Sequence, residues 1–420
     1  MRKSTGYPGL GPFTVAALTP PDVNVRVVDE SVEDVDPDWI PDLVGITTLT
    51  HTAPHVYRVS QQYRDRGIPV VLGGVHVTMN PDEAEQHASS IVVGEAELSW
   101  PRLIDDFRRG ELKPRYEPGL LADLDASPPA NREHMRFRDY QIPNVMLTSK
   151  GCPFDCEFCT LVAVVDYKMR FRSVESVIEE IRNLPPGPLL FVDDNLYANK
   201  EYARELFRQL APLKRKWTGE ATWHITFDDE TLTLAKKSGC LGLFVGFDAI
   251  GPQHMMRKVA QDPQKTYVEA VRNMQRKGMA IVAAFVFGFD NDDPGVFSRT
   301  WEIIRQSQAD LVNFSVLVPY PGTPMFERFE REGRIIERDW SKYVTPNVVY
   351  QPKNMTPEQL REGTQWIHNR FFSLGNVAKA AVRTTLRSGW GLGLLALKLN
   401  LARGRNISFL ESAAHSPGSA

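Results

Sequence analysis

Apolar and polar positions alternate along the chain in two separate series of short strands and helices. In the first series, apolar runs at 23–28, 43–48, 69–74 and 90–95 are interrupted by helical patterns, one of them near 54–66. Strands that alternate with helices predict a parallel, doubly wound sheet. Ligands of such sheets lie beyond the carboxyl ends of the strands. Those ends carry Thr47, Thr48, Gly73, Gly74, Gly94 and Glu95.

The start of the chain departs from this pattern. It opens on the glycine-rich segment Gly6-Tyr-Pro-Gly-Leu-Gly, and no buried strand precedes this segment. We therefore expect the N-terminal sheet to lack the usual first strand.

The second series begins at Val145. Its apolar strands are expected at 145–148, 189–192, 222–226, 241–246, 281–287 and 311–318. Six strand and helix units fit a partial barrel or another open sheet, and periodicity alone does not separate the two. The predicted organisation is a Rossmann-like domain (1–110), a connector (111–141), the barrel-like domain (142–330) and a C-terminal helical extension (331–410).

Composition narrows the class of protein. Apolar residues make up 42% and charged residues 24%, and the net charge of -3 gives no general attraction to nucleic acid, so we expect no nucleic-acid partner. The N-terminus has no apolar core of signal-peptide length, and no run of about 18 or more apolar residues appears in the chain, which predicts a cytoplasmic protein. Of the four cysteines, three lie within eight positions, as in a metal site and unlike a disulfide framework.

The three clustered cysteines are Cys152, Cys156 and Cys159, in Gly-Cys-Pro-Phe-Asp-Cys-Glu-Phe-Cys. Thiolates are the ligands of iron-sulfur clusters, and spacings of four and three let one loop reach three irons of a 4Fe-4S cluster. The fourth iron would stay open to bind S-adenosylmethionine (SAM). The alternatives are a zinc loop, for which no fourth ligand is near, and three unrelated core cysteines. Cys240 is expected to be a small buried hydrophobe.

Cys-x-x-x-Cys-x-x-Cys followed by strand and helix units resembles the radical SAM superfamily. The resemblance continues in Phe191-Val-Asp-Asp-Asn, Gly246-Phe-Asp-Ala-Ile and Pro319-Tyr-Pro-Gly-Thr-Pro, and it extends from about residue 6 to 370. The chain is most similar to the subgroup with an N-terminal cobalamin-binding domain and a C-terminal helical extension, which includes hopanoid-modifying and natural-product methylating enzymes. The resemblance favours a partial (β/α)6 barrel for 142–330.

The resemblance also implies roles for residues of the barrel. Asp193, Asp194 and Asn195 would hold the amino group of SAM, although Asp and Asn also serve as helix caps. Gly246 and Asp248 would lie near the SAM ribose, with a simple turn as the alternative for Asp248. Phe158 can pack on the adenine.

In the N-terminal domain the resemblance implies a cobalamin site. Its expected contacts are Thr47, Thr48, Leu49, Gly73, Gly74, Gly94 and Glu95, because glycines let the backbone approach a large flat ligand. We expect a bulky residue at Gly73 or Gly74 to expel the corrin without unfolding the protein. The Asp-x-His-x-x-Gly motif is absent, so no histidine of that motif would bind the cobalt. His51, His55 and His76 are candidates for the corrin's surroundings or for ordinary surface or capping roles.

The leading interpretation is a cobalamin-dependent radical SAM enzyme that methylates an unactivated carbon of a lipid or secondary metabolite. The alternatives are a radical SAM rearrangement, cyclisation or ring contraction, and an iron-sulfur redox-sensing module without substrate chemistry. A reducing donor such as flavodoxin or ferredoxin would supply the electron. Finally, Val382, Leu386, Trp390, Leu394 and Leu397 recur at spacings of three or four. This face must be buried, either against the protein's own barrel, which we expect, or as a peripheral contact of the C-terminal helix with a membrane.

Overall fold

The computed structural model describes residues 6–36, 38–119, 121–165, 168–248 and 263–414. The chain forms two compact units. The first contains residues up to Asp194 together with Val318–Val344, and the second contains Asn195–Leu317 and the chain from Thr345 onward. In the described part of the chain, no helix is both long and apolar enough to cross a membrane.

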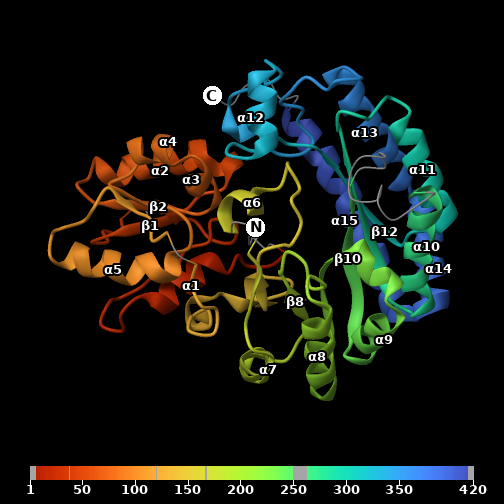
Figure 1. Cartoon of the computed structure of the whole chain (residues 1–420), viewed down its shortest axis with the longest axis horizontal. Coiled ribbons are helices and arrows are strands. Elements are labelled where there is room, and N and C mark those ends of the chain that lie inside the picture. Colours follow the sequence, from red (N-terminus) through yellow and green to blue (C-terminus); the bar gives the residue numbers. More distant parts are fainter. Residues whose placement is uncertain (1–5, 37, 120, 166–167, 249–262, 415–420) are drawn as a thin grey trace. The chain divides into compact units, whose positions relative to one another are not determined.

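The first unit begins with a four-stranded parallel sheet (Figure 1). Its order is β1 (Val44–Thr47), β2 (Val70–Gly73), β3 (Ser90–Val92) and β4 (Arg115–Tyr116). Successive residues of β2 pack on opposite faces, since Leu72 contacts the cluster that contains Val56 and Val71 contacts the cluster that contains Trp100. Burial on both faces explains why β2 is a continuous apolar run.

Five α-helices accompany this sheet. They are α1 (Gly11–Leu18), α2 (Ala53–Arg64), α3 (Val75–Met79), α4 (Pro81–Gln86) and α5 (Ala96–Arg108). Val56 and Tyr63 of α2 pack on one face of the sheet, and Leu103 and Ile104 of α5 pack on the other. The Rossmann-like architecture expected for the N-terminal part is confirmed, and among the described residues before Val44 (6–36 and 38–43) none forms a strand of this sheet.

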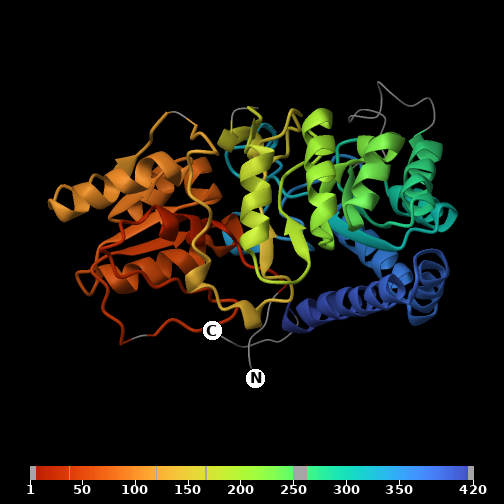
Figure 2. The ribbon, with the colours of Figure 1, turned by 90° about the horizontal axis from the view of Figure 1, so that it is seen from below.

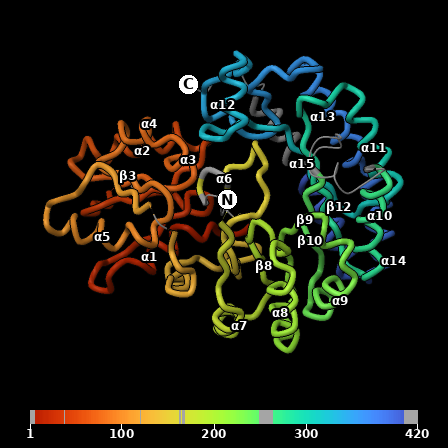
Figure 3. Tube along the Cα trace, in the orientation of Figure 1, coloured from red at the N-terminus to blue at the C-terminus, as the bar shows by residue number. Residues whose placement is uncertain are grey.

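Two details differ from the sequence-based expectation. The predicted strand at 23–28 is wrong, because these residues are not part of a ladder; their alternation reflects side chains that are in turn exposed and half-buried. The fourth strand of the sheet, β4, instead comes from the segment predicted as a connector. Figure 3 traces this part of the chain from orange to yellow.

The rest of the first unit carries the cysteine loop. The parallel strands β5 (Asn144–Met146) and β8 (Leu189–Phe191) are joined through α7 (Val174–Asn183). Between β5 and α7, an antiparallel pair forms from β6 (Ser149–Lys150) and β7 (Arg170–Phe171), with α6 (Thr160–Val165) between its strands. α12 (Pro324–Arg331) also belongs to this unit.

The second unit contains four parallel strands in chain order. They are β9 (Trp217–Thr222), β10 (Cys240–Asp248), β11 (Ala280–Phe287) and β12 (Leu311–Val316). Their helices are α8 (Lys200–Leu210), α9 (Asp229–Lys237), α10 (Pro263–Arg276) and α11 (Val296–Ser307). The strand predicted at 222–226 lies earlier in the chain, because β9 ends at Thr222 and Trp223–Phe227 form a 3-10 helix.

The predicted C-terminal helical region is also confirmed. It consists of α13 (Pro357–Phe371), α14 (Leu374–Ser388) and α15 (Trp390–Ala414). Short 3-10 helices elsewhere span Thr50–Thr52, Arg132–His134, Phe137–Asp139, Ala211–Leu213 and Trp340–Lys342. The mixed α/β fold with parallel sheets therefore agrees with the sequence-based fold class.

Gly74 illustrates a constraint that the sequence did not disclose. Its φ is +96°, and a Cβ there would lie 2.7 Å from Thr47 Oγ1 and 2.9 Å from the Thr48 backbone N. The glycine therefore allows β1 and the start of α3 to approach. The expectation that the fold tolerates a bulky residue at Gly74 is not supported by this geometry, whereas a Cβ at Gly73 would make only ordinary contacts at 3.8 Å.

We predict that Gly74→Ala lowers the urea midpoint of unfolding by more than Gly67→Ala. Gly67 also has a positive φ, of 73°, but a Cβ there would meet nothing within 4 Å. Both variants carry a backbone strain of about 1 kcal/mol. Gly74→Ala adds the clash with Thr47 and Thr48, for a further loss of about 1–3 kcal/mol. Equal midpoints in the two variants would contradict the close-approach argument.

Candidate cofactor-binding site

The cysteine loop begins where β6 ends and is closed at its base by pairing of β6 with β7. Lys150 pairs with Arg170 in this ladder. Gly151 follows with φ +102°, and a Cβ there would lie 2.4 Å from the carbonyl O of Lys168, so only glycine fits. Cys152, Cys156 and Cys159 are all partly exposed, and the backbone N of Cys159 donates to the carbonyl of Cys156 at 2.9 Å.

Contacts with α12 fix the middle of the same loop. The backbone N of Met325 donates to the carbonyl of Glu157 at 3.0 Å, and Arg328 binds the Glu157 carboxylate at 2.8 Å. Over the described residues, no three His, Cys, Asp or Glu side chains converge as ligands of one metal ion. Cys240 is buried, and burial raises the pKa of its thiol to about 12, in keeping with the expected inert role.

The three polar residues after β8 point in different directions. Asp193 is 0% exposed, and its carboxylate accepts hydrogen bonds from the backbone N and Oγ1 of Thr148 and from Ser149 Oγ. Burial raises the pKa of Asp193. Asn195 Oδ1 accepts from the backbone N of Tyr197 and of Thr222. Asp193 and Asn195 therefore hold backbone in place.

Asp194 has a different environment. Its Oδ2 accepts from the backbone N of Gly151 at 3.2 Å, next to the first cysteine of the loop. The side chain stays accessible because it lines a cavity, while the surrounding protein atoms desolvate it and raise its pKa to about 6. Asp194 is thus the member of the predicted trio that a bound molecule can reach.

Two cationic residues at the base of the cysteine loop bind carboxylates of the N-terminal domain. Arg170 Nη2 and Nη1 bind the two carboxylate oxygens of Glu95 at 2.5 and 2.8 Å. Lys150 Nζ lies 2.5 Å from Glu97 and 3.3 Å from Glu95. Burial alone would raise the pKa of Glu95, but the hydrogen bond from Arg170 and the charges of Lys150 and Arg170 hold it below its ordinary value. Glu95, predicted as a cofactor contact, therefore also links α5 to the loop.

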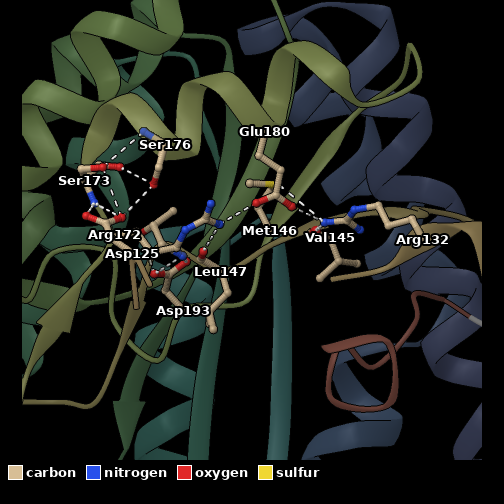
Figure 4. A network of polar contacts seen from close by, with 11 residues as sticks. Asp125, Arg132, Val145, Met146, Leu147, Arg172, Ser173, Ser176, Glu180 and Asp193 are labelled. Carbon is tan, nitrogen blue, oxygen red and sulfur yellow. Dashed lines mark hydrogen bonds and ion pairs between the residues drawn. The ribbon is translucent and has the colours of Figure 1, made fainter. Parts of the chain in front are cut away.

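A second ionic network supports β5, the strand that leads into the loop (Figure 4). Glu180 of α7 binds Arg132 at 2.8 Å and Arg172 at 2.5 Å. The two arginines in turn donate to the carbonyl oxygens of Val145 and Leu147. All three charged side chains are largely buried, so removal of one partner would leave a costly unpaired charge.

A cavity of about 1440 Å³ adjoins the carboxyl ends of β1, β2 and β3, and all of its lining residues belong to the first unit. It exceeds the roughly 300–1,000 Å³ of ordinary small-molecule sites. Thr47, Leu49, Gly73, Gly74, Gly94 and Glu95 line it, as do Lys150, Gly151 and Asp194 beside the cysteine loop. A Cβ at Gly94 would meet nothing within 4 Å, so the backbone is open to a ligand there. A corrinoid fits the volume of this cavity and the open glycine backbone along its lining.

Several predicted residues lie elsewhere. Thr48 is fully buried and is not among the lining residues. His76 is also buried, and its ring nitrogens approach Thr50 Oγ1 and the Tyr57 hydroxyl, so it belongs to the core and not to the corrin's surroundings. His55 does line the cavity and binds Glu30 at 2.9 Å.

The other expected SAM contacts were Phe158, Gly246 and Asp248. Phe158 is partly exposed in the cysteine loop, Gly246 lies within β10, and the side chain of Asp248 falls outside the described residues. Sequence reasoning missed Lys150 and Arg170. The only available signal was that both flank the loop whose cysteines it identified.

Comparisons with known proteins agree with this site. A B12 binding domain model matches residues 13–104, and a radical SAM superfamily model matches residues 146–297. Bacteriochlorophyllide d C-12(1)-methyltransferase from Chlorobaculum tepidum is 33% identical over 364 residues, covering 83% of this chain and 79% of that protein. Hopanoid C-2 methylase from Rhodopseudomonas palustris is 26% identical, covering 79% and 66%.

Among solved structures, radical SAM methyltransferase TsrM from Kitasatospora setae, with cobalamin and a [4Fe-4S] cluster bound, superposes with a TM-score of 0.62. The two chains are 17% identical, and the match covers 86% of this chain and 85% of that one. This likeness supports the fold.

A three-cysteine loop closed on a parallel α/β scaffold, with a matching family model, defines a radical SAM enzyme. The chain belongs to the radical SAM superfamily, in the group that carries an N-terminal B12-binding domain. Its cofactors are a 4Fe-4S cluster, SAM and cobalamin.

We predict that replacing Cys152, Cys156 and Cys159 together by Ala abolishes cluster absorption and SAM cleavage after anaerobic reconstitution, since the loop supplies the thiolates. Cys240→Ala is the matched control, because this thiol is buried elsewhere and should leave bound iron unchanged. Iron and sulfide analysis with the visible spectrum measures both. An intact cluster in the triple variant, or its loss in the control, would refute the assignment.

Proposed function

We propose that this enzyme methylates an unactivated carbon in a cobalamin-dependent reaction. The observation that carries the proposal is that one cavity is lined both by the ends of β1–β3 and by Lys150, Gly151 and Asp194 beside the cysteine loop. Cobalamin and SAM would therefore occupy adjoining parts of the same cavity. The 33% identity to a methyltransferase over most of both chains supports the same reaction.

The residues of the chain have separable tasks in this proposal. The three loop cysteines hold the cluster, and Asp194 accepts a charge-assisted hydrogen bond from the SAM ammonium. When bound, the cluster and SAM supply a 5′-deoxyadenosyl radical that removes a hydrogen atom, and cobalamin supplies the methyl group. The ion pairs of Glu95 with Arg170 and Lys150 hold the part of the cavity at the strand ends next to the part beside the cysteine loop.

The substrate we propose is a large, mostly apolar ring compound. Relatives that match most of this chain are named for bacteriochlorophyllide and hopanoid methylation. A low-potential donor such as a flavodoxin or ferredoxin would deliver the electron.

The reaction predicts two SAM-derived products in parallel. With reductant, cobalamin and substrate, the enzyme should form 5′-deoxyadenosine from hydrogen abstraction and S-adenosylhomocysteine from methyl donation, in comparable amounts by liquid chromatography and mass spectrometry. Deuterated methyl-SAM should shift the product mass by three. The Cys156→Ala variant serves as the control and should form neither compound by this route.

The main competing function is a cyclisation or rearrangement. It is favoured by the anaerobic magnesium-protoporphyrin IX monomethyl ester cyclase of Cereibacter sphaeroides, which is 25% identical over 89% of this chain. In that case 5′-deoxyadenosine would form without substrate-dependent S-adenosylhomocysteine. An iron-sulfur sensor would form neither product from any substrate.

The role of Asp194 gives a separate prediction. Asp194→Asn should weaken SAM binding by about tenfold, the value of one charge-assisted hydrogen bond, while the cluster spectrum is unchanged. Asp193→Asn is the matched control, because its carboxylate is buried against Thr148 and Ser149 and should affect stability more than affinity. Equilibrium dialysis with labelled SAM measures both. An affinity loss confined to Asp193→Asn would reverse the assignment.

A further inference from the structure

The helices α14 and α15 form a hairpin in which large apolar side chains face solvent and mainly small or polar side chains face the protein. The two helices pack along each other. A Cβ at Gly393 would fall against Thr385, and one at Gly404 would approach Phe372. Because the later glycine lies beside the earlier residue, the two helices run antiparallel. Most residues that face inward are small or polar: Ala380, Thr384, Ala396 and Asn400 are buried, together with the apolar Val377. In Figure 2, α15 is the long dark-blue helix.

Polar contacts attach this inner face to the sheet of the second unit. Thr384 Oγ1 donates to Asp310 Oδ1 at 2.6 Å, Arg387 binds the same carboxylate, and Asn400 donates to the carbonyl of Asp310 at 3.1 Å. Arg403 donates to the carbonyl of Val312. The orientation of the hairpin is therefore fixed by hydrogen bonds and ion pairs just before and within β12.

The apolar line predicted from the sequence points the other way, into solvent. Leu386 is 82% exposed and Trp390 is 84% exposed, and they are joined by Val382, Leu394 and Leu395. The expectation that this line packs against the protein's own barrel is therefore wrong for these residues. A contiguous exposed apolar surface of this kind marks an interaction site.

The charges around this surface indicate its partner. The hairpin, residues 374–414, contains six Lys or Arg and a single acidic residue, Glu411. Lys379 and Lys398 are exposed, lie three or four residues from Val382 and Leu394, and have no carboxylate partner among the described residues. Lys379 on α14 and Lys398 on α15 flank the apolar tip of the hairpin, which consists of Val382, Leu386, Trp390, Leu394 and Leu395. An exposed Trp and Leu tip with lysines at its edges has the chemistry of an interfacial membrane contact.

We infer that the tip of the α14–α15 hairpin inserts into the surface of an anionic membrane. The apolar side chains enter the acyl boundary, and Lys379 and Lys398 bind lipid headgroups. The proposed contact is peripheral, because only the side chains at the tip of the hairpin enter the membrane. This inference does not depend on the reaction proposed above, because it rests on the hairpin alone.

Cosedimentation of the full-length holoenzyme with vesicles tests the inference. The wild type should pellet with vesicles of phosphatidylcholine and phosphatidylglycerol, and much less with phosphatidylcholine alone. Leu386→Glu with Trp390→Glu should reduce binding by at least about tenfold, since the buried apolar area is lost. Lys379→Gln and Lys398→Gln should each reduce it roughly fivefold, and less at high salt.

Ile336→Glu is the matched control, because Ile336 is an exposed apolar residue of the other unit and should leave pelleting unchanged. All variants alter exposed side chains, so circular dichroism and cluster absorption should match the wild type. Absence of wild-type pelleting, or pelleting that the Glu variants do not reduce, would overturn the inference. A dimer in light scattering that the double variant converts to monomer, without lipid binding, would reassign the face to a second copy of the chain.

Discussion

The first unit depends on one buried carboxylate, that of Glu95. Glu95 is the N-cap residue of α5 and follows β3. Its carboxylate forms a bidentate ion pair with Arg170, which lies 75 residues later at the base of the cysteine loop. The backbone N of Ala122 and the ammonium of Lys150 complete its contacts. Since a charge buried without its partner costs several kcal/mol, separating the N-terminal sheet from the cysteine loop is unfavourable. The shared cavity thereby acquires fixed walls on both sides.

Much of this arrangement could be predicted from local sequence. The spacing of Cys152, Cys156 and Cys159 identified the cluster loop because spacings of four and three let one loop reach three irons of a cluster. Periods of apolar residues identified β2 and β11 because both are buried continuous strands. The glycines after β2 and β3 were recognised because a ligand at a sheet edge needs open backbone, and Gly73, Gly74 and Gly94 do line the cavity.

Other parts of the arrangement could not be predicted from local sequence, because they depend on contacts between distant residues and on the directions in which side chains point. No local pattern pairs Glu95 with Arg170, and none distinguishes Asp193 from Asp194, whose carboxylates lie one residue apart but face the protein interior and the cavity respectively. Apolar periodicity found the stripe on α14 and α15 but not its direction. That direction follows from Asp310, whose bonds to Thr384 and Arg387 hold the polar side of the hairpin inward.

The closed base of the cysteine loop has a consequence for how the cluster-binding segment is held. Pairing of Ser149 with Phe171 and of Lys150 with Arg170 joins the two ends of the loop, so the thiol-bearing segment is an excursion from an already completed scaffold. The two ends of the loop are therefore held together by backbone pairing, which does not involve iron or sulfide.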